Sequence, residues 1–259
     1  FVMFAAAYAA YAVIPFSSTF IPAGINIGLV YIFAISALGV VAIVMGGWAS
    51  ANKYSLLGAM RAAAQMVSYE IPLAMVILSM ATLAGSLDMQ EIVIGQGGGF
   101  WNWNLFGGAG DISKIWVLPF TFALFMIYFI GSLAETSRAP FDIVEGESEL
   151  VAGYATEYGG MKYAMLYFAE YSNMFIVAAI IVVLFLGGWQ SPFGDFLNSP
   201  IMQAAWFICK AMTVVFVQIW VRWTLPRLRV DQLMYITWKV MLPISFVCFF
   251  AVAALALLK

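Results

Sequence analysis

The sequence predicts an all-α integral membrane protein: one polytopic domain over residues 1–259, a bundle of about seven transmembrane helices. Apolar residues make up 64% of the chain and charged residues only 9%, whereas soluble domains average about 45–50% and about 25%. The apolar residues also form long, uniform runs, while the strands of a membrane barrel alternate apolar and polar residues. Backbone groups inside a bilayer must bond internally, so helices are the expected form.

The spans follow one another with short connections. The first run is short for a span, which needs roughly 20 apolar residues, and the other six each have about that length. The segment 52–70 is amphipathic at its start and leads into the third run. The predicted spans are residues 1–15, 24–45, 62–84, 115–134, 163–186, 204–223 and 240–258.

Basic residues are unevenly divided between the two sets of loops. The second set holds only Lys114 and Lys259, and Lys210 could snorkel toward it from the sixth span. The positive-inside rule therefore predicts that the first set faces the cytoplasm. The basic residues of the first set are Lys53, Arg61, Arg138, Lys162, Arg222, Arg227, Arg229 and Lys239.

Several cofactor and ligand classes are excluded by residue type. The chain has no histidine, and its two cysteines, Cys209 and Cys248, lie singly in apolar runs. His-ligated haem, most zinc sites and iron–sulfur clusters are therefore excluded. We also expect no other metal and no flavin bound by this chain. The net charge of −2 leaves no basic stripe for nucleic acid. The glycine-rich loop 85–114 lacks the context of a dinucleotide fingerprint and is interpreted as a flexible outer loop.

The most informative segment is an acidic loop at about residues 135–161, predicted to be cytoplasmic. Six of the 13 acids of the chain lie in residues 135–158, opposed by one cation, Arg138. A solvated acidic loop would explain the charges alone. However, apolar residues such as Phe141 interrupt the acids, which favours a loop folded against protein. Its acids are Glu135, Asp142, Glu145, Glu147, Glu149 and Glu157.

Two further acids lie inside predicted spans. Glu70 is roughly 13 Å beyond Arg61 along a helix, and Glu170 is roughly 12 Å beyond Lys162. A charge in hydrocarbon costs about 2.5–3.5 kcal/mol on insertion scales, so such groups face a bundle interior or a water-filled path. A structural hydrogen bond between helices is the simpler alternative. Together with the acidic loop, these carboxyls could pass protons as a coupled set.

Three arginines lie near the base of the last two spans. Arg222, Arg227 and Arg229 could set topology beside lipid head groups, which composition alone favours. They could also balance the acidic loop or donate hydrogen bonds to the polar head of a ligand.

Four blocks carry a family resemblance. They are KYSLLGAMRAAAQMVSYEIP (53–72), AETSRAPFDIVEGESELVAGYATEYGGMKYAMLYFAEY (134–171), FLGGW (185–189) and RWTLPRLRVDQLMYITWK (222–239). The chain resembles the H subunit of bacterial complex I, the proton-pumping NADH:quinone oxidoreductase of the respiratory chain, known as subunit 1 in mitochondria.

The resemblance implies a role without a redox centre in this chain. The family forms the membrane side of a chamber for quinone (ubiquinone or menaquinone) beneath the hydrophilic arm, in the bacterial inner membrane. Its expected partners are the quinone-site and iron–sulfur subunits of that arm and adjacent small membrane subunits. The implied chamber residues are Arg138, Phe141, Asp142, Arg222, Arg227 and Arg229. The implied proton-coupling acids are Glu70, Glu135, Glu145, Glu147, Glu149, Glu157 and Glu170.

One departure and two alternatives accompany the resemblance. The family has a further first span and an amphipathic segment before the position of Phe1, so we expect a longer native protein with eight spans. The equivalent subunit of a membrane-bound hydrogenase, or of another ferredoxin- or deazaflavin-dependent ion pump, is similar to this family. A stand-alone proton transporter would also explain acids within spans.

Overall fold

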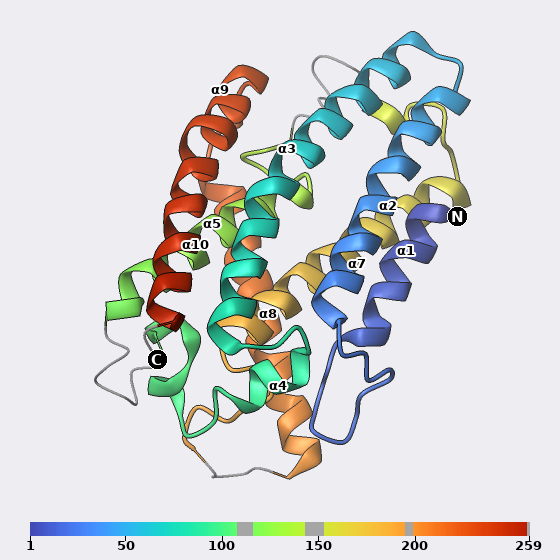
Figure 1. Ribbon diagram of the computed structural model, residues 1–259. Coiled ribbons are helices and arrows are strands. Elements are labelled where there is room, and N and C mark those ends of the chain that lie inside the picture. Colours follow the sequence, from blue (N-terminus) through green and yellow to red (C-terminus); the bar gives the residue numbers. More distant parts are fainter. Residues whose placement is uncertain (108–115, 143–152, 195–198, 258–259) are drawn as a thin grey trace.

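The computed structural model describes residues 1–107, 116–142, 153–194 and 199–257, and all its regular elements in those ranges are helical. Six helical segments there are long and apolar enough to cross a membrane, and a shorter apolar helix precedes them. The all-α membrane fold is therefore confirmed (Figure 1). The spans are α2 (Gly28–Ala49), α3 (Lys53–Ala84), α5 (Leu118–Glu135), α7 (Met161–Phe185), α8 (Pro200–Thr224) and Val230–Leu257.

The short apolar helix at the amino end and the last span are irregular. The short helix is α1 (Val2–Ala10) followed by a 3-10 turn, Tyr11–Val13. The last joins α9 (Val230–Tyr235) to α10 (Leu242–Leu257) through a π-helical stretch, Ile236–Met241.

Two helices begin earlier than their apolar runs, because polar groups cap them. Helix α3 begins at Lys53 rather than at residue 62, and the Asn52 side chain accepts a hydrogen bond from Tyr54 N at 3.0 Å. The last span begins at Val230 rather than at residue 240, and Gln232 accepts a hydrogen bond from Arg229 N at 3.2 Å. Hydropathy marks only the membrane-embedded part of each helix. The predicted spans therefore leave out the polar first turns of α3 and of the last span.

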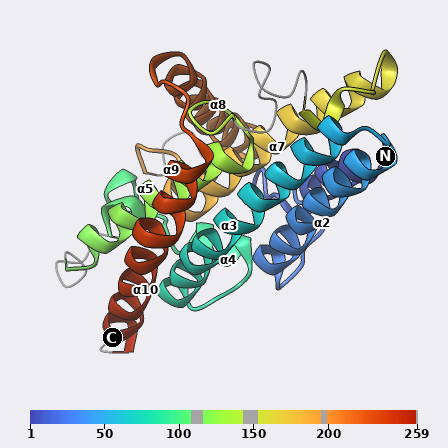
Figure 2. The same ribbon diagram turned by 90° about the horizontal axis from the view of Figure 1, so that it is seen from above.

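Helix α7 forms the centre of the bundle. Of the residues in its most apolar stretch, 67% are buried, against 22% in α2 and in the last span. It packs against α1, α5 and α8. On the other side, α3 lies between α2 and α10, as the view from above shows (Figure 2).

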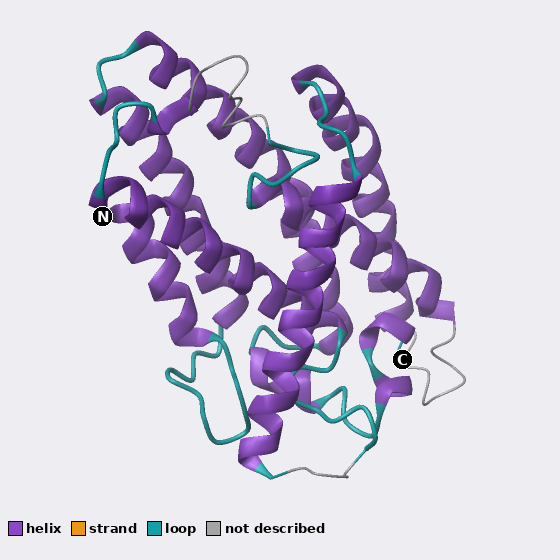
Figure 3. Ribbon diagram, turned by 180° about the vertical axis from the view of Figure 1, so that it is seen from behind, coloured by secondary structure: helices purple, strands orange, loops and turns teal. Residues whose placement is uncertain are grey.

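The connections gather at the two ends of the bundle (Figure 3). Links 50–52 and 225–229 and the described parts of 136–160 lie at one end, with α9. Segments 14–27 and 186–194 and the described part of 85–117 lie at the other, with α4 (Met89–Ile94). This grouping matches the two sets of loops that the charge distribution predicts.

The second set of loops is built around the carboxyl end of α7, where the last carbonyls of a helix lack partners within the helix. Lys210 Nζ, on α8, donates to the carbonyls of Leu186 (2.7 Å), Gly188 (3.0 Å) and Gln190 (2.7 Å). It also lies 4.2 Å from the centre of the Trp103 ring. Lys210 thus extends toward the second set of loops, as expected, and its ammonium is buried there among carbonyl acceptors.

Residues 85–107 also fold onto this helix end. Gln96 Nε2 donates to Val183 O at 2.9 Å, and Asn104 Nδ2 donates to Leu184 O at 2.9 Å. Gln96 Oε1 in turn accepts from Gly187 N at 3.0 Å. A flexible outer loop is therefore the wrong interpretation for these residues, because their polar side chains cap α7.

Replacing Lys210 by Met should destabilise the protein by more than about 2 kcal/mol, because the carbonyls lose a charged donor and stay buried. Thermal unfolding of the purified protein in detergent would measure the loss. Lys239→Met is the matched control, since Lys239 also lies over an aromatic ring, Tyr235, but is exposed. Equal stability of the two variants would contradict the capping role.

Candidate functional site

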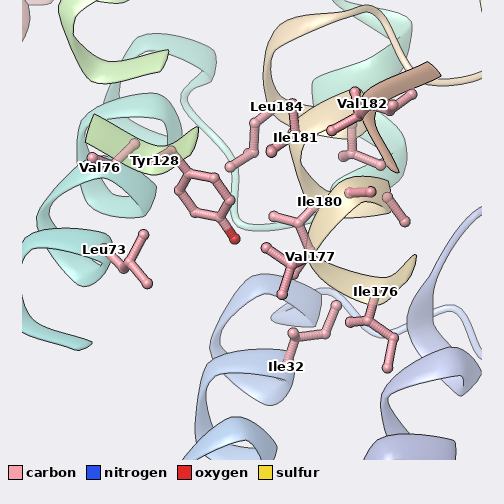
Figure 4. Close-up of a cluster of buried hydrophobic side chains, with 14 of the residues drawn as sticks. Ile32, Leu73, Val76, Tyr128, Ile176, Val177, Ile180, Ile181, Val182 and Leu184 are labelled. Carbon is pink, nitrogen blue, oxygen red and sulfur yellow. The ribbon is translucent and has the colours of Figure 1, made fainter. Parts of the chain in front are cut away.

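An internal hollow lies among α1, α2, α3, α5 and α7. It contains about 890 Å³ of empty space, including the part that opens outward. Figure 4 shows part of its wall, where Ile32, Leu73, Val177 and Ile180 lie close to Tyr128. The wall is mostly apolar, and its polar members are Ser36, Tyr69, Glu70, Tyr128, Glu135 and Asn173.

A second, smaller hollow adjoins the first at the end of the bundle that holds the acidic loop. It contains about 380 Å³ of empty space, including the part that opens outward, and its polar lining includes Thr136, Ser137, Tyr154 and Glu170. Both hollows are lined by Glu135 and Asn173, together with Met3, Ile43 and Met66. The two spaces therefore adjoin, and carboxyl groups line them from Glu70 through Glu135 to Glu170.

Three different helices contribute the three carboxyls. Glu70 lies within α3, Glu135 is the last residue of α5, and Glu170 lies in the first half of α7. Glu70 and Glu135 are partly buried, and the Glu170 side chain is 12% exposed. Glu70 and Glu135 are close enough to repel each other when both are charged. One proton shared between them would relieve that repulsion.

Glu170 is paired with the arginine of the acidic loop. Arg138 Nη2 lies 3.1 Å from Glu170 Oε1, and the Arg138 side chain is 6% exposed. The guanidinium carbon also lies 4.4 Å from the centre of the Tyr171 ring. A buried ion pair adds little net stability, but removing one partner leaves the other charge uncompensated.

The first part of the acidic loop is fixed to α3. Gln65 Nε2 donates to both Ala134 O and Phe141 O at 2.9 Å. Phe141 N donates to Arg138 O at 2.8 Å, closing a turn, and the Phe141 ring meets Tyr69 edge-on with centroids 5.5 Å apart. This turn sets the position of Arg138 relative to Glu170.

The last part of the loop is fixed to the start of α3 and to α2. Ser55 Oγ donates to Tyr154 O at 3.0 Å, and Tyr158 donates from its hydroxyl to Gly46 O at 3.1 Å. A β-carbon on Gly58 would come within 2.8 Å of the Gly153 backbone. The described parts of the loop therefore fold against protein, as the apolar residues among the acids predict.

The structure divides the predicted site residues into groups. Glu70, Glu135 and Glu170 share the hollows, with Arg138 and Phe141 buried beside them and Asp142 partly buried. Glu145, Glu147 and Glu149 lie outside the described residues.

The remaining predicted residues lie apart from the hollows. Glu157 is exposed and accepts a hydrogen bond from Asn52 Nδ2 at 2.7 Å, beside the start of α3. Arg222, Arg227 and Arg229 line neither hollow; Arg227 is exposed, as is most of the surrounding 222–229 stretch.

Sequence reasoning missed Gln65, Tyr128 and Asn173. Gln65 and Asn173 are polar residues within spans, and Asn173 follows Glu170 by three positions, which places both on one face of α7. Tyr128 precedes Glu135 by seven positions, or two helical turns. Helical spacing from the known acids could have pointed to Asn173 and Tyr128.

Within the described ranges, no three His, Cys, Asp or Glu side chains are placed to hold a metal ion. What the site offers is acids, amides and hydroxyls around a space lined mainly by apolar groups. The fold and this site define a class of protein. It is a helical membrane protein in which partly buried carboxyl groups lead from the interior to the end that carries the acidic loop.

The chain belongs to the NADH dehydrogenase family, whose model matches residues 1–253. It is 53% identical over 258 residues to the H subunit of the NADH-quinone oxidoreductase of Chlorobium luteolum, covering 96% of this chain and 67% of that protein. The corresponding protein of Chlorobaculum tepidum is 51% identical, with 96% and 69% covered. That of Phenylobacterium zucineum is 46% identical, with 98% and 71% covered.

These comparisons confirm the family resemblance drawn from the four sequence blocks. The chain spans about two thirds of the length of these relatives.

The ion pair can be tested by a double-mutant cycle of Arg138→Met and Glu170→Gln. Each single variant should lose about 3–5 kcal/mol of stability, because it leaves a polar or charged partner buried and uncompensated. The double variant should lose less than the sum by at least about 1 kcal/mol. Thermal unfolding of the four proteins measures the coupling, and additive losses would show that the two side chains do not depend on each other.

Proposed function

We propose that this chain is the H-type membrane subunit of a proton-translocating NADH:quinone oxidoreductase, and that its partly buried carboxyls link quinone reduction to proton movement. One observation carries the proposal beyond family membership. Glu70, Glu135 and Glu170 line two adjoining hollows, and these reach the loop that holds Arg138. A structural hydrogen bond between two helices would not need such a row.

The loop turn that carries Arg138 and Phe141 is proposed to form the membrane side of the quinone chamber, with Asp142 beside it. Both ends of the loop are fastened to α3, which also carries Glu70. Helix α3 therefore holds the proposed chamber loop and also carries one of the acids, Glu70. Quinone is the substrate, and the electrons reach it from centres that other subunits hold.

The coupling step assigned to this chain is electrostatic. Quinone takes up protons as it is reduced, so the charge beside the loop changes during turnover. If that change draws Arg138 away from Glu170, the loss of a positive neighbour favours the protonated form of the carboxyl. Glu135 shares one hollow with Glu170 and the other with Glu70, so the three carboxyls can redistribute protons as a coupled set.

The end of the bundle that carries the acidic loop is proposed to face the cytoplasm of a bacterial cell, because most basic residues gather at that end. The hydrophilic-arm subunits would cover this end, and small membrane subunits would adjoin the bundle. Arg222, Arg227 and Arg229 suit either a partner subunit or lipid head groups. Glu145, Glu147, Glu149 and Glu157 remain proposed proton-coupling acids.

The two alternatives are less well supported. The relatives described above are named for quinone reduction, which favours that branch over the hydrogenase-type complexes. Their names also denote one component of an assembly, which disfavours a stand-alone transporter. Purification from native membrane as a lone chain with proton flux would overturn the proposal.

Glu135→Gln and Glu70→Gln should each lower NADH-driven quinone reduction and proton uptake together by at least about fivefold, because a neutral amide cannot carry a proton along the row. Both rates can be measured on the assembled enzyme in vesicles, with NADH oxidation by a soluble acceptor as the assembly check. Glu91→Gln is the matched control, since Glu91 is exposed at the opposite end. Normal coupled activity in both buried variants would remove the acids from the mechanism.

The proposed orientation can be tested by cysteine labelling after Cys209 and Cys248 are replaced. Gly159→Cys, at a site with open space for a side chain, should react with a membrane-impermeant maleimide only from the cytoplasmic side. Ser199→Cys, exposed at the other end, should react only from outside. The reverse pattern would invert the orientation.

A further inference from the structure

Tyr128 is a buried polar group that the acid row does not yet explain. It lies on α5, is 2% exposed and lines the larger hollow together with Glu70 and Glu135. Figure 4 shows its phenol oxygen directed away from α5 into the space between α3 and α7, among Leu73, Val177 and Ile180.

The Tyr128 ring packs against Phe185, and the Tyr128 hydroxyl faces apolar side chains. The Tyr128 and Phe185 rings lie with their centroids 6.4 Å apart in a tilted arrangement. The labelled neighbours of the phenol oxygen, Leu73, Val177 and Ile180, are apolar and offer it no hydrogen bond. A buried tyrosine hydroxyl normally has a hydrogen-bonding partner. The hollow itself must therefore supply that partner.

The hydroxyl also lies within the electric field of the acids. Tyr128 and Glu135 are two helical turns apart on one face of α5, or about 10.5 Å along the axis. The charge of Glu135 acts on Tyr128, and that of Glu70 acts on Glu135. Side chains of a helix lean toward its amino terminus, so Glu135 leans toward the turn that carries Tyr128.

We propose that Tyr128 is a positioning residue whose hydroxyl orients the water that connects Glu135 with Glu70. This rests on the proposed function, in which those acids exchange protons. A neutral phenol can both donate and accept a hydrogen bond. It therefore serves a water molecule next to a carboxylate or next to a protonated carboxyl, and it holds the chain of hydrogen bonds together in both states.

Tyr128→Phe tests the proposal because it removes one oxygen atom and keeps the ring. In the assembled enzyme, the rate of quinone reduction should fall about three- to tenfold while the KM for quinone stays unchanged. The ratio of rates in H2O and D2O should rise, since proton movement becomes more limiting. Tyr8→Phe is the control, because Tyr8 carries the same group at 48% exposure.

The outcomes separate this inference from the proposed function. If Tyr128→Phe keeps the normal rate and isotope ratio while Glu135→Gln is impaired, Tyr128 has no such role and the acid row stands. If Tyr128→Phe lowers thermal stability but leaves the isotope ratio unchanged, the hydroxyl is structural and the inference is overturned. If Glu70→Gln and Glu135→Gln are also normal, the proposed function fails first.

Discussion

The absence of water from the hydrocarbon region is the constraint on which this structure depends. Charged groups and unpaired carbonyls there must find partners within the protein. Helix α7 meets this constraint at two places with a cation from elsewhere in the chain. Arg138 pairs with Glu170 in its first half, and Lys210 occupies the carbonyls beyond its last turn. The most buried helix is therefore also tied to loops at both ends of the bundle.

Helix α3 plays the complementary part, because it supports the acidic loop. Gln65 holds the first part of the loop, and Ser55 and Gly58 hold the last part. The same helix carries Glu70 into the larger hollow, farther along its length. A rearrangement of the loop thus acts on two helices that both line the hollows, and no separate transmitting element is needed.

The sequence predicts the spans well, because apolar length is a direct consequence of bilayer thickness. The sequence also identifies Glu70 and Glu170 as candidates, because a charged group inside a span is costly unless it faces the protein interior or water. The sequence could not place Glu157. Its neighbours in the sequence resemble those of the other loop acids, but its carboxylate accepts a hydrogen bond from Asn52. Nor could the sequence pair Arg138 with Glu170 or find Tyr128 in the hollow, because both depend on how distant helices pack.

Arg138 lies close enough to Glu170 for a small movement to change the electrostatic energy of the carboxyl by an amount that matters for its protonation. At about 4 Å and an effective dielectric constant near 20, two unit charges attract by about 4 kcal/mol, and doubling the distance halves this. A shift of a few ångströms in the turn closed by Phe141 N and Arg138 O would therefore change the charge balance at Glu170 by about 2 kcal/mol. That is about a thirtyfold change in the ratio of charged to protonated carboxyl. A small movement of a fastened loop is sufficient, and no large rearrangement of the bundle is required.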